Sequence, residues 1–297
     1  MSPKIPNDGK TYFAVSDIHS FYDPLKEALD EAGYDPSNEN HVLIVCGDIF
    51  DRGSQTLEVL DFLKSIPKKQ RILIRGNHER LLRYCYLEGE YQSYDFSNGT
   101  VRTMCQLAGT DPDWRDKYYQ EMIFNTKLDD NQQSKLYLKE WERNYEKPFR
   151  SRKIKKVIDW IWSDEWRDFY EVGDYIFVHA WLPLKKVLDD YGDERITFDP
   201  DWRQAGESEW DEASWACPWK MYLSGYLPKG KTVVCGHWHA WDFHTHLGHD
   251  VDGYRNRDIY YSEHLIALDA CTALEPNICN VLILEGGRCY DKHHKAL

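Results

Sequence analysis

Five short apolar segments, each followed directly by polar residues with metal-binding or proton-carrying side chains, constrain the fold of this 297-residue chain most strongly. They are residues 12–15, 42–46, 72–74, 175–178 and 232–235. Short apolar runs of this kind, bounded by glycine or charge, predict buried strands rather than helices. Two further runs at 265–268 and 280–284 bring the prediction to seven strands, arranged in two sheets or one large sheet.

The segments between the first three strands have helical spacing. Asp23 and Pro24 precede apolar residues at helical intervals, which predicts a helix with Asp23 as its N-cap. A second helix is expected between Ser54 and Pro67. Strands alternating with helices over residues 12–77 predict parallel pairing with right-handed crossovers. In such a sheet the polar residues at the carboxyl ends of the strands lie along one edge.

Residues 84–165 form a different kind of segment, charged and aromatic, without strand-like runs, and we expect helices inserted into the α/β unit. Within it, residues 147–156 carry six basic residues and no acid. This pattern is typical of a solvated helix face, and a docking patch for an anionic substrate is the alternative. Length alone is compatible with two domains. We expect a single domain over residues 1–297, with the helical, aromatic-rich insertion at about 84–165.

Composition excludes some classes of partner. The net charge of −13 disfavours binding to long nucleic acid or to anionic membranes, because both require a positive surface. No apolar stretch approaches the ~18–20 residues of a membrane span. The eight cysteines include no C-x-x-C pair, which favours reduced thiols. We therefore expect a cytoplasmic protein with no membrane partner.

The polar residues at the strand ends are of the types that bind divalent metals. Carboxylate, amide and imidazole groups suit ions such as Mn, Fe and Zn. They are too numerous for one ion, whereas two ions sharing a carboxylate would use them all. The residues are Asp17, His19, Asp48, Asn77, His78, His179, His237 and His239. Arg52 lies close by in sequence, and its guanidinium has the geometry to pair with two phosphate oxygens.

The motifs that contain these residues resemble the calcineurin-like metallophosphoesterases. They are Asp17-Ile-His19, Gly47-Asp48-Ile-Phe-Asp51-Arg52-Gly53, Gly76-Asn77-His78-Glu79, Val178-His179 and Gly236-His237-Trp-His239. The second and third motifs resemble in particular the phosphoprotein phosphatase branch, which includes serine/threonine phosphatases and diadenosine tetraphosphatases. The resemblance covers about residues 12–83 and 157–285 and leaves the insertion uncovered.

The resemblance implies an α/β fold, a four-layer αββα sandwich, and a site with two divalent ions. Mn²⁺ is expected first, with Fe, Zn or Ni as alternatives. Carried over to this sequence, it implies that Asp17 and His19 bind the first metal and that Asp48 bridges both. It implies further that Asn77, His179 and His237 bind the second metal and that His239 approaches the first. His78 would be the general acid, oriented by Asp51, and Arg52 would bind the phosphate.

The sequence departs from the family at one place that matters for the substrate. The segment Ala213-Ser-Trp215-Ala-Cys217-Pro218 resembles one that normally carries a second phosphate-binding arginine. Cys217 stands in its place, and Lys220 is the nearest basic residue that can bind substrate instead. Ser16 and Ser20 also replace the glycines that usually flank the first motif. Asp269, which follows a predicted strand, is expected to support the site.

The function expected from these features is hydrolysis of phosphate esters through a water activated by two metals. A phosphomonoesterase resembling the serine/threonine protein phosphatases is expected first. The alternatives are a dinucleoside polyphosphate (diadenosine tetraphosphate) hydrolase and a metal-dependent phosphodiesterase. An inactive binding module is disfavoured, because every implied ligand is present. The expected substrates are accordingly a phosphoprotein, a small phosphoester or a nucleotide.

Overall fold

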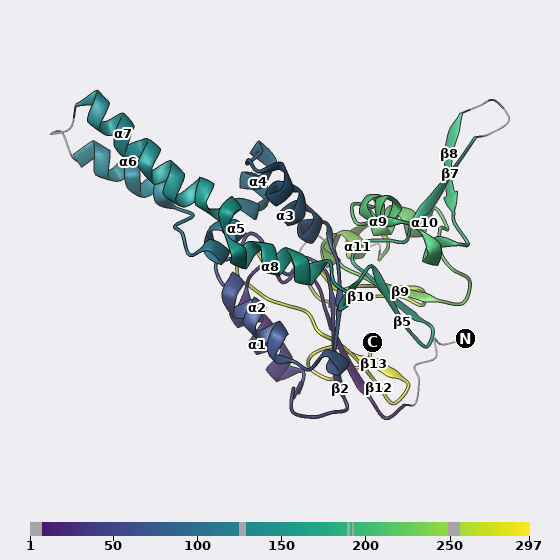
Figure 1. Cartoon of the computed structure of the whole chain (residues 1–297). Helices are drawn as coiled ribbons and strands as arrows, with labels where there is room; N and C mark the ends of the chain where they lie inside the picture. Colours follow the sequence, from purple (N-terminus) through teal and green to yellow (C-terminus); the bar gives the residue numbers. More distant parts are fainter. Residues whose placement is uncertain (1–7, 125–128, 189–190, 192, 249–255) are drawn as a thin grey trace.

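The computed structural model describes residues 8–124, 129–188, 191, 193–248 and 256–297 (Figure 1). A six-stranded sheet contains the three strands predicted nearest the N-terminus. Its order is β13 (Arg288–Tyr290), β12 (Leu282–Glu285), β1 (Thr11–Val15), β2 (His41–Cys46), β3 (Arg71–Ile74) and β4 (Trp166–Arg167). Strands β1 to β4 are parallel, with Phe13 opposite Leu43. The predicted parallel pairing is therefore confirmed, while β12 and β13 extend the sheet with antiparallel strands.

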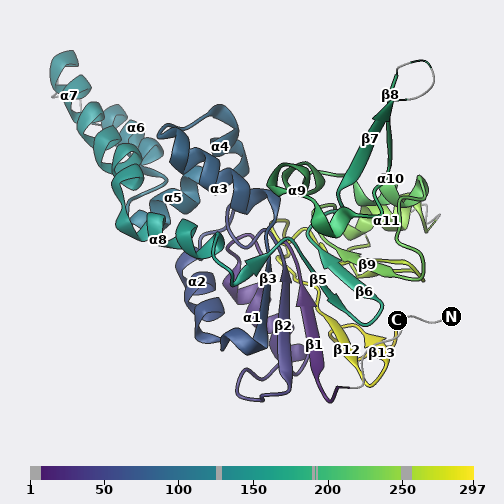
Figure 2. The ribbon, with the colours of Figure 1, turned by 45° about the vertical axis from the view of Figure 1, so that its right-hand side comes forward.

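A second sheet of five strands contains the remaining ligand-bearing strands. Its order is β10 (Tyr260–Tyr261), β11 (Leu265–Ala267), β9 (Thr232–Cys235), β6 (Tyr175–Val178) and β5 (Phe169–Val172). Strands β6, β9 and β11 are parallel to one another. A separate hairpin of β7 (Leu184–Leu188) and β8 (Glu194–Phe198) projects away from both sheets (Figures 1 and 2).

Both faces of each sheet are buried, and this produces four layers. Along β1, Tyr12 and Ala14 face the second sheet, where they pack in one cluster with Phe177. Phe13 and Val15 face the helices instead. These are mainly α1 (Tyr22–Glu31), α2 (Thr56–Ser65) and α8 (Arg152–Ile161). The outer face of the second sheet is covered by α9 (Glu207–Ala213), α10 (Pro218–Leu223) and α11 (Ala240–His246). The expected αββα sandwich is confirmed.

The insertion is helical, as predicted, and the described part of residues 84–165 contains no strand. Its elements are α3 (Asn77–Glu88), α4 (Ser93–Asn98), α5 (Thr100–Ala108), α6 (Trp114–Phe124), α7 (Asp130–Trp141), a π-helical turn η2 (Glu142–Glu146), a 3-10 turn η3 (Lys147–Arg150) and α8. Helices α6 and α7 form an arm that projects from the body of the protein (Figures 1 and 2). Its base has its own aromatic core of Trp114, Tyr118 and Tyr145.

The basic run at 147–156 spans η3 and the start of α8. Ile154 is buried there, whereas Lys155 pairs with Asp159 on an exposed face. Arg150 likewise pairs with exposed Glu146. The arrangement matches the solvated-face interpretation.

Some element ends differ from the sequence prediction. Helix α1 begins at Tyr22, so Asp23 lies within its first turn and is not the N-cap. All seven predicted strands are present; β6 and β9 have the predicted ends, and the others differ by one or two residues. The sequence analysis missed six strands, namely β4, β5, β7, β8, β10 and β13. Two further 3-10 turns, η1 (Lys68–Gln70) and η4 (Trp202–Gln204), complete the elements.

Two other features bear on the composition argument. None of the eight cysteines is in a disulfide. Among the residues described, no helix combines the length and the apolar composition needed to cross a membrane.

Candidate metal centre and active site

The carboxyl ends of strands from both sheets meet at one buried site. Asp17 and His19 follow strand β1, Asp48 follows β2, and Asn77 follows β3. His179 follows β6, and His237 follows β9. Two groups have metal-ligand spacing, with donor atoms within 4.8 Å of one another. One contains His19, Asp48 and His78, and the other contains Asp48, His179 and His237. Asp48 belongs to both, as expected for a bridging carboxylate.

The imidazoles turn lone pairs, not protons, toward the centre of the site. The Nδ1 of His179 lies 2.9 Å from the carbonyl oxygen of Cys46, and the Nδ1 of His19 lies 3.0 Å from that of Phe50. These contacts assign the ring proton to Nδ1 and leave Nε2 as an electron-pair donor. The Nε2 of His179 is 3.3 Å from Nδ1 of His237 and 3.4 Å from Oδ1 of Asp48. Electron-pair donors that face one another in this way fit a divalent cation.

The electrostatics of the site agree with this fit. Burial, reinforced by neighbouring His78, lowers the pKa of His19 to about 3. Burial and His179 lower the pKa of His237 to the same value. Burial, followed by the Asp269 and Asp48 carboxylates, raises the pKa of Asp17. Neutral imidazoles beside crowded carboxylates are the groups that a pair of cations would stabilise.

The Asp48 loop is held by a buried acid to which the sequence analysis gave no role. The Glu79 carboxylate accepts backbone N–H bonds from Asp48 and Ile49 at 2.9 Å and from Gly76 at 2.7 Å. Burial and the Asp48 charge raise its pKa to about 7. The available signal was its place three residues after the glycine that precedes a helix, the position of a capping-box acid.

The backbone is also unusual at these residues. Positive φ angles occur at Asp17, His19, Asp48, Asp51, Arg52 and His237. Such conformations are costly for residues with a side chain and are typical of functional sites. Close backbone approach also requires glycine, because a Cβ on Gly76 would lie 2.1 Å from Oδ1 of Asp48. A Cβ on Gly236 would lie 2.0 Å from Oδ2 of Asp17.

His78 differs from the other imidazoles of the site. Its Nδ1 lies 2.7 Å from Oδ2 of Asp51, and its Nε2 faces Oδ2 of Asp48 at 3.8 Å. Burial opposes a charge on this ring, but the Asp48 and Asp51 carboxylates outweigh burial and raise its pKa. The ring of His19 lies only 4.7 Å away, centroid to centroid, with its pKa shifted in the opposite direction. An imidazole with a raised pKa beside imidazoles with lowered pKa values is the arrangement expected for an acid among ligands.

The cavity at this site is small, about 100 Å³. Its lining includes four residues beyond the expected ligands and His78, namely Arg52, Asn98 at the end of α4, Trp215 and Asp269. The sequence analysis missed Asn98 and did not assign Trp215 to the site. Lys220 does not line the cavity, and its ammonium lies over the ring of Trp219 at 5.3 Å. The expectation that Lys220 binds substrate is therefore not matched by its position.

His239 lines the same cavity but is absent from both ligand-spaced groups. Its Nδ1 lies 2.8 Å from Oδ2 of Asp269, whose Oδ1 accepts the backbone N–H of Cys271. Burial lowers the pKa of His239, but the interactions with Asp269 and Cys271 together outweigh burial and raise it to about 10. Asp269 thus lines the cavity and bonds His239, which agrees with the supporting position expected for it.

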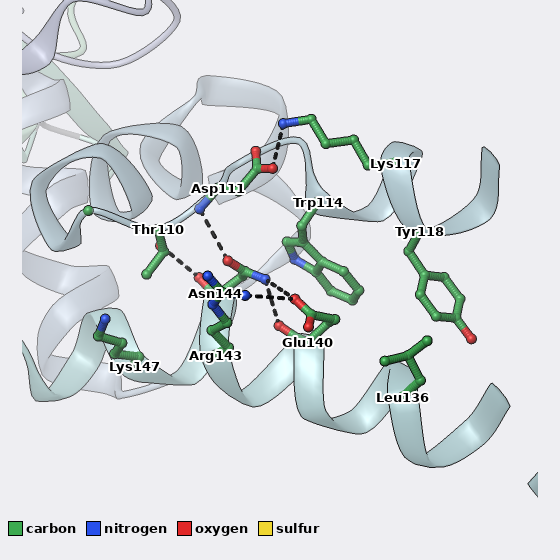
Figure 3. Close-up of a pocket in the computed structure, with 11 residues that line it drawn as sticks. Thr110, Asp111, Trp114, Lys117, Tyr118, Leu136, Glu140, Arg143, Asn144 and Lys147 are labelled. Atoms are coloured by element: carbon green, nitrogen blue, oxygen red, sulfur yellow. Dashed lines mark hydrogen bonds and ion pairs between the residues drawn. The ribbon is translucent and has the colours of Figure 1, made fainter. Parts of the chain in front are cut away.

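A larger hollow of about 560 Å³ lies at the base of the helical arm (Figure 3). Asn144 accepts a bond from the backbone of Asp111 and donates to Glu140, and Lys117 pairs with Asp111. These polar groups largely satisfy one another and hold α5, α6 and α7 together. The hollow shares no lining residue with the metal-site cavity.

Comparison with known proteins agrees with this geometry. The family described as calcineurin-like phosphoesterase matches residues 11–241, well over half of the chain. A symmetrical bis(5'-nucleosyl)-tetraphosphatase of Aeromonas hydrophila is 40% identical over 65 residues, which cover 22% of this chain and 23% of that protein. The asymmetrical bis(5'-nucleosyl)-tetraphosphatase PrpE of Bacillus subtilis is 35% identical over 85 residues, 26% of this chain and 34% of that protein.

The match to these curated relatives spans only about a quarter to a third of their length. A cold-active protein-tyrosine phosphatase of a psychrophilic Shewanella species superimposes with a TM-score of 0.50 at 15% identity. That alignment covers 97% of this chain and 80% of the other, and it shows a shared fold. With the family match over residues 11–241, the chain belongs to the calcineurin-like phosphoesterase family.

Proposed function

We propose that this protein is a metal-dependent phosphoesterase with two divalent ions. Asp17 and His19 would hold the first ion, with His239 near it. Asn77, His179 and His237 would hold the second, and Asp48 would bridge them. The observation that carries the proposal is the convergence of electron-pair donors from both sheets on one buried point. Mn²⁺ is the ion we expect first, because the donors are a mixture of oxygen and nitrogen.

Bound cations would supply an activated water and neutralise charge on the phosphate. The remaining work falls to side chains of this protein. The Arg52 guanidinium, at the cavity wall, is placed to pair with phosphate oxygens. His78 lines the cavity and has a raised pKa, so its Nε2 would donate a proton to the leaving oxygen. Asp51 holds the other ring nitrogen and fixes the orientation of His78.

The size of the cavity supports a terminal phosphoryl group as the part that enters. Its volume of about 100 Å³ equals that of a few water molecules, since each occupies ~30 Å³ in the liquid. The remainder of a substrate would therefore lie outside. A phosphomonoester, such as a phosphorylated side chain of a protein, is the substrate class that we propose.

Hydrolysis of dinucleoside polyphosphates is the second candidate. It is supported by the names of the two relatives and by Trp215, whose side chain lines the cavity and is 48% exposed. An exposed indole beside a phosphate site offers a surface on which a nucleobase can stack.

The deciding experiment compares four substrates with the same purified protein, with Mn²⁺ and with EDTA. These are p-nitrophenyl phosphate, bis(p-nitrophenyl) phosphate, a phosphoserine peptide and diadenosine tetraphosphate. We expect Mn²⁺-dependent hydrolysis, with both monoesters cleaved faster than the diester. Preference for the tetraphosphate would favour the second candidate, and preference for the diester would favour a phosphodiesterase. Absence of all four activities with two ions bound would contradict the proposal.

Asp48→Asn tests the metal assignment. Because Asp48 belongs to both ligand groups, metal content should fall. Activity should fall by more than the ~10–100-fold that loss of an outer-shell partner costs. Asp61→Asn, a change of the same chemistry on the exposed side of α2, is the control. Metal analysis and kcat/KM would show whether the two variants differ, and near-normal values for Asp48→Asn would refute a bridging role.

His78→Asn tests the acid assignment. Protonation of the leaving oxygen contributes typically ~10²–10⁴-fold, and it matters most for a poor leaving group. We expect a large loss of kcat on an alkyl phosphate and a much smaller loss on p-nitrophenyl phosphate. Equal losses on the two substrates would identify His78 as a ligand or a structural residue.

A further inference from the structure

The helical insertion contacts the catalytic turn directly at the junction of α4 and α5. Gly99 stands between these helices with a φ of 92°. A Cβ on Gly99 would lie 2.3 Å from the backbone nitrogen of Arg52, so the insertion backbone packs against the Asp51–Arg52 turn. Both residues of that turn have positive φ angles, 74° and 63°. The turn therefore needs support from its neighbours to hold this conformation.

Two threonines that follow Gly99 supply hydrogen bonds to Asp51. The Thr100 hydroxyl donates to Oδ2 of Asp51 at 2.9 Å. The Thr103 hydroxyl donates to Oδ1 at 2.6 Å and accepts the Asp51 backbone N–H at 2.9 Å. The side chain and the backbone of Asp51 are thus both held by the insertion.

These contacts surround the same carboxylate that orients His78. Oδ2 of Asp51 is shared by the Thr100 hydroxyl and Nδ1 of His78, the latter at 2.7 Å. Asp51, Thr100 and Thr103 are completely buried. Water has no access to replace a lost hydroxyl there, so each bond limits how the carboxylate can rotate.

We propose that Thr100 and Thr103 are positioning residues for general acid catalysis, fixing the Asp51 carboxylate so that it holds His78 toward the leaving oxygen. This inference rests on the proposed role of His78. It assigns a part in the reaction to the start of the insertion. The arm of α6 and α7 has no part in this inference. Neither threonine lines the metal-site cavity.

The test uses Thr100→Val and Thr103→Val, which remove the hydroxyl and preserve the shape of the side chain. Each should lower kcat on an alkyl phosphate by about tenfold, the equivalent of one hydrogen bond to a charged group. The loss on p-nitrophenyl phosphate should be within about threefold, and KM and metal content should not change, because neither hydroxyl reaches substrate or metal. Thr100→Ser and Thr103→Ser, which retain the hydroxyl, should restore the rate on the alkyl phosphate.

Thr110→Val is the matched control within the same insertion. Its hydroxyl bonds the carbonyl oxygens of Cys105 and Asn144, away from Asp51. It should leave the leaving-group dependence unchanged. In a His78→Asn background, Thr100→Val should cause no further loss, because the hydroxyl acts through that ring.

The outcomes separate this inference from the proposed function. Absence of Mn²⁺-dependent activity in the unmodified protein would refute the proposed function. If the unmodified protein has normal activity, two results would overturn only the positioning role. These are equal losses on both substrates in the valine variants, and no rescue by the serine variants. Thr103→Val also removes the partner of the Asp51 N–H. If Thr103→Val does not fold, Thr100→Val alone tests the positioning role.

Discussion

At the scale of single residues, the cavity is lined by one guanidinium and, besides the proposed metal ligand Asn77, one amide. Arg52 and Asn98 both line it, whereas Cys217 precedes α10 as its N-cap residue and Lys220 lies against Trp219. A neutral amide binds phosphate oxygens through fewer and weaker contacts than an arginine fork. We therefore expect that the nearest basic residue in the sequence does not replace the missing arginine.

Alanine substitutions provide a test of this placement. We expect Arg52→Ala to lower kcat/KM for p-nitrophenyl phosphate most, and Asn98→Ala to lower it by about threefold to tenfold, as loss of one hydrogen bond would. Lys220→Ala should have almost no effect. Steady-state kinetics on the three variants would check the order. A loss for Lys220→Ala equal to that for Arg52→Ala would return Lys220 to the substrate-binding role expected from the sequence.

At the scale of elements, an acid after α8 connects the insertion to the first sheet. Glu165 pairs with Lys68 at 2.7 Å and with Arg71, and it accepts a bond from the indole of Trp160. Burial would raise the pKa of Glu165, but these bonds outweigh burial and lower it to about 2. Its contribution to stability is therefore fully present above its unfolded pKa, near 4.5. That contribution is lost as the pH falls from there through about 2.

Acid unfolding measures that contribution. Glu165→Gln should be less stable than the unmodified protein at pH 6, and this difference should shrink between pH 4.5 and 2. Thermal unfolding monitored by circular dichroism over this range provides the measurement. Glu27→Gln, on the exposed face of α1, is the control and should follow the unmodified protein. A stability difference that does not depend on pH would show that Glu165 acts through packing alone.

Some strands could be predicted from the sequence and others could not. Strands β1, β2, β6 and β9 were predictable because they are buried throughout or nearly so, and their apolar runs end in polar residues. Hairpin β7–β8 was missed because it is largely exposed and lacks such a run. Strands β4 and β10 contain two residues each, too few to show any period.

At the scale of the whole molecule, the metal site joins the two sheets. Asp17, His19, Asp48 and Asn77 come from the first sheet, and His179 and His237 come from the second. The two sheets also share one apolar cluster between them. Ligands and core therefore link the N-terminal and C-terminal parts of the chain. This supports our proposal of a single domain.

Thermal unfolding with and without metal tests this coupling. Each ion that binds only the folded state should add about 2.7 kcal/mol of stability at a hundredfold excess over its Kd, and two such ions should raise Tm by roughly 5 °C or more. We expect one transition with Mn²⁺ and one, at lower temperature, with EDTA. Differential scanning calorimetry gives both values. Two separate transitions would contradict a single domain, and an Asp48→Asn variant should lose most of the shift.

The local patterns of the sequence determined which residues we expect to carry the chemistry. An apolar strand followed by a polar turn is recognisable because hydrophobic burial and strand period act over a few neighbouring residues. That is why Asp17, Asp48, Asn77, His179 and His237 could be named as candidate ligands, and why a parallel sheet was expected to place the first three at one edge.

The tertiary structure alone decided what surrounds them. Glu79, Thr100 and Thr103 bond residues about 30 to 50 positions away in the chain, apart from the Glu79 bond to Gly76. Asn98 lines a cavity with residues from both sheets. Their contacts arise from how helices pack against strand ends, which no local period records. Lys220 shows the opposite case, since it is close in sequence to the missing arginine but its helix directs it to Trp219. Proximity along the chain is not proximity in space, because burial of apolar faces sets the orientation of each helix.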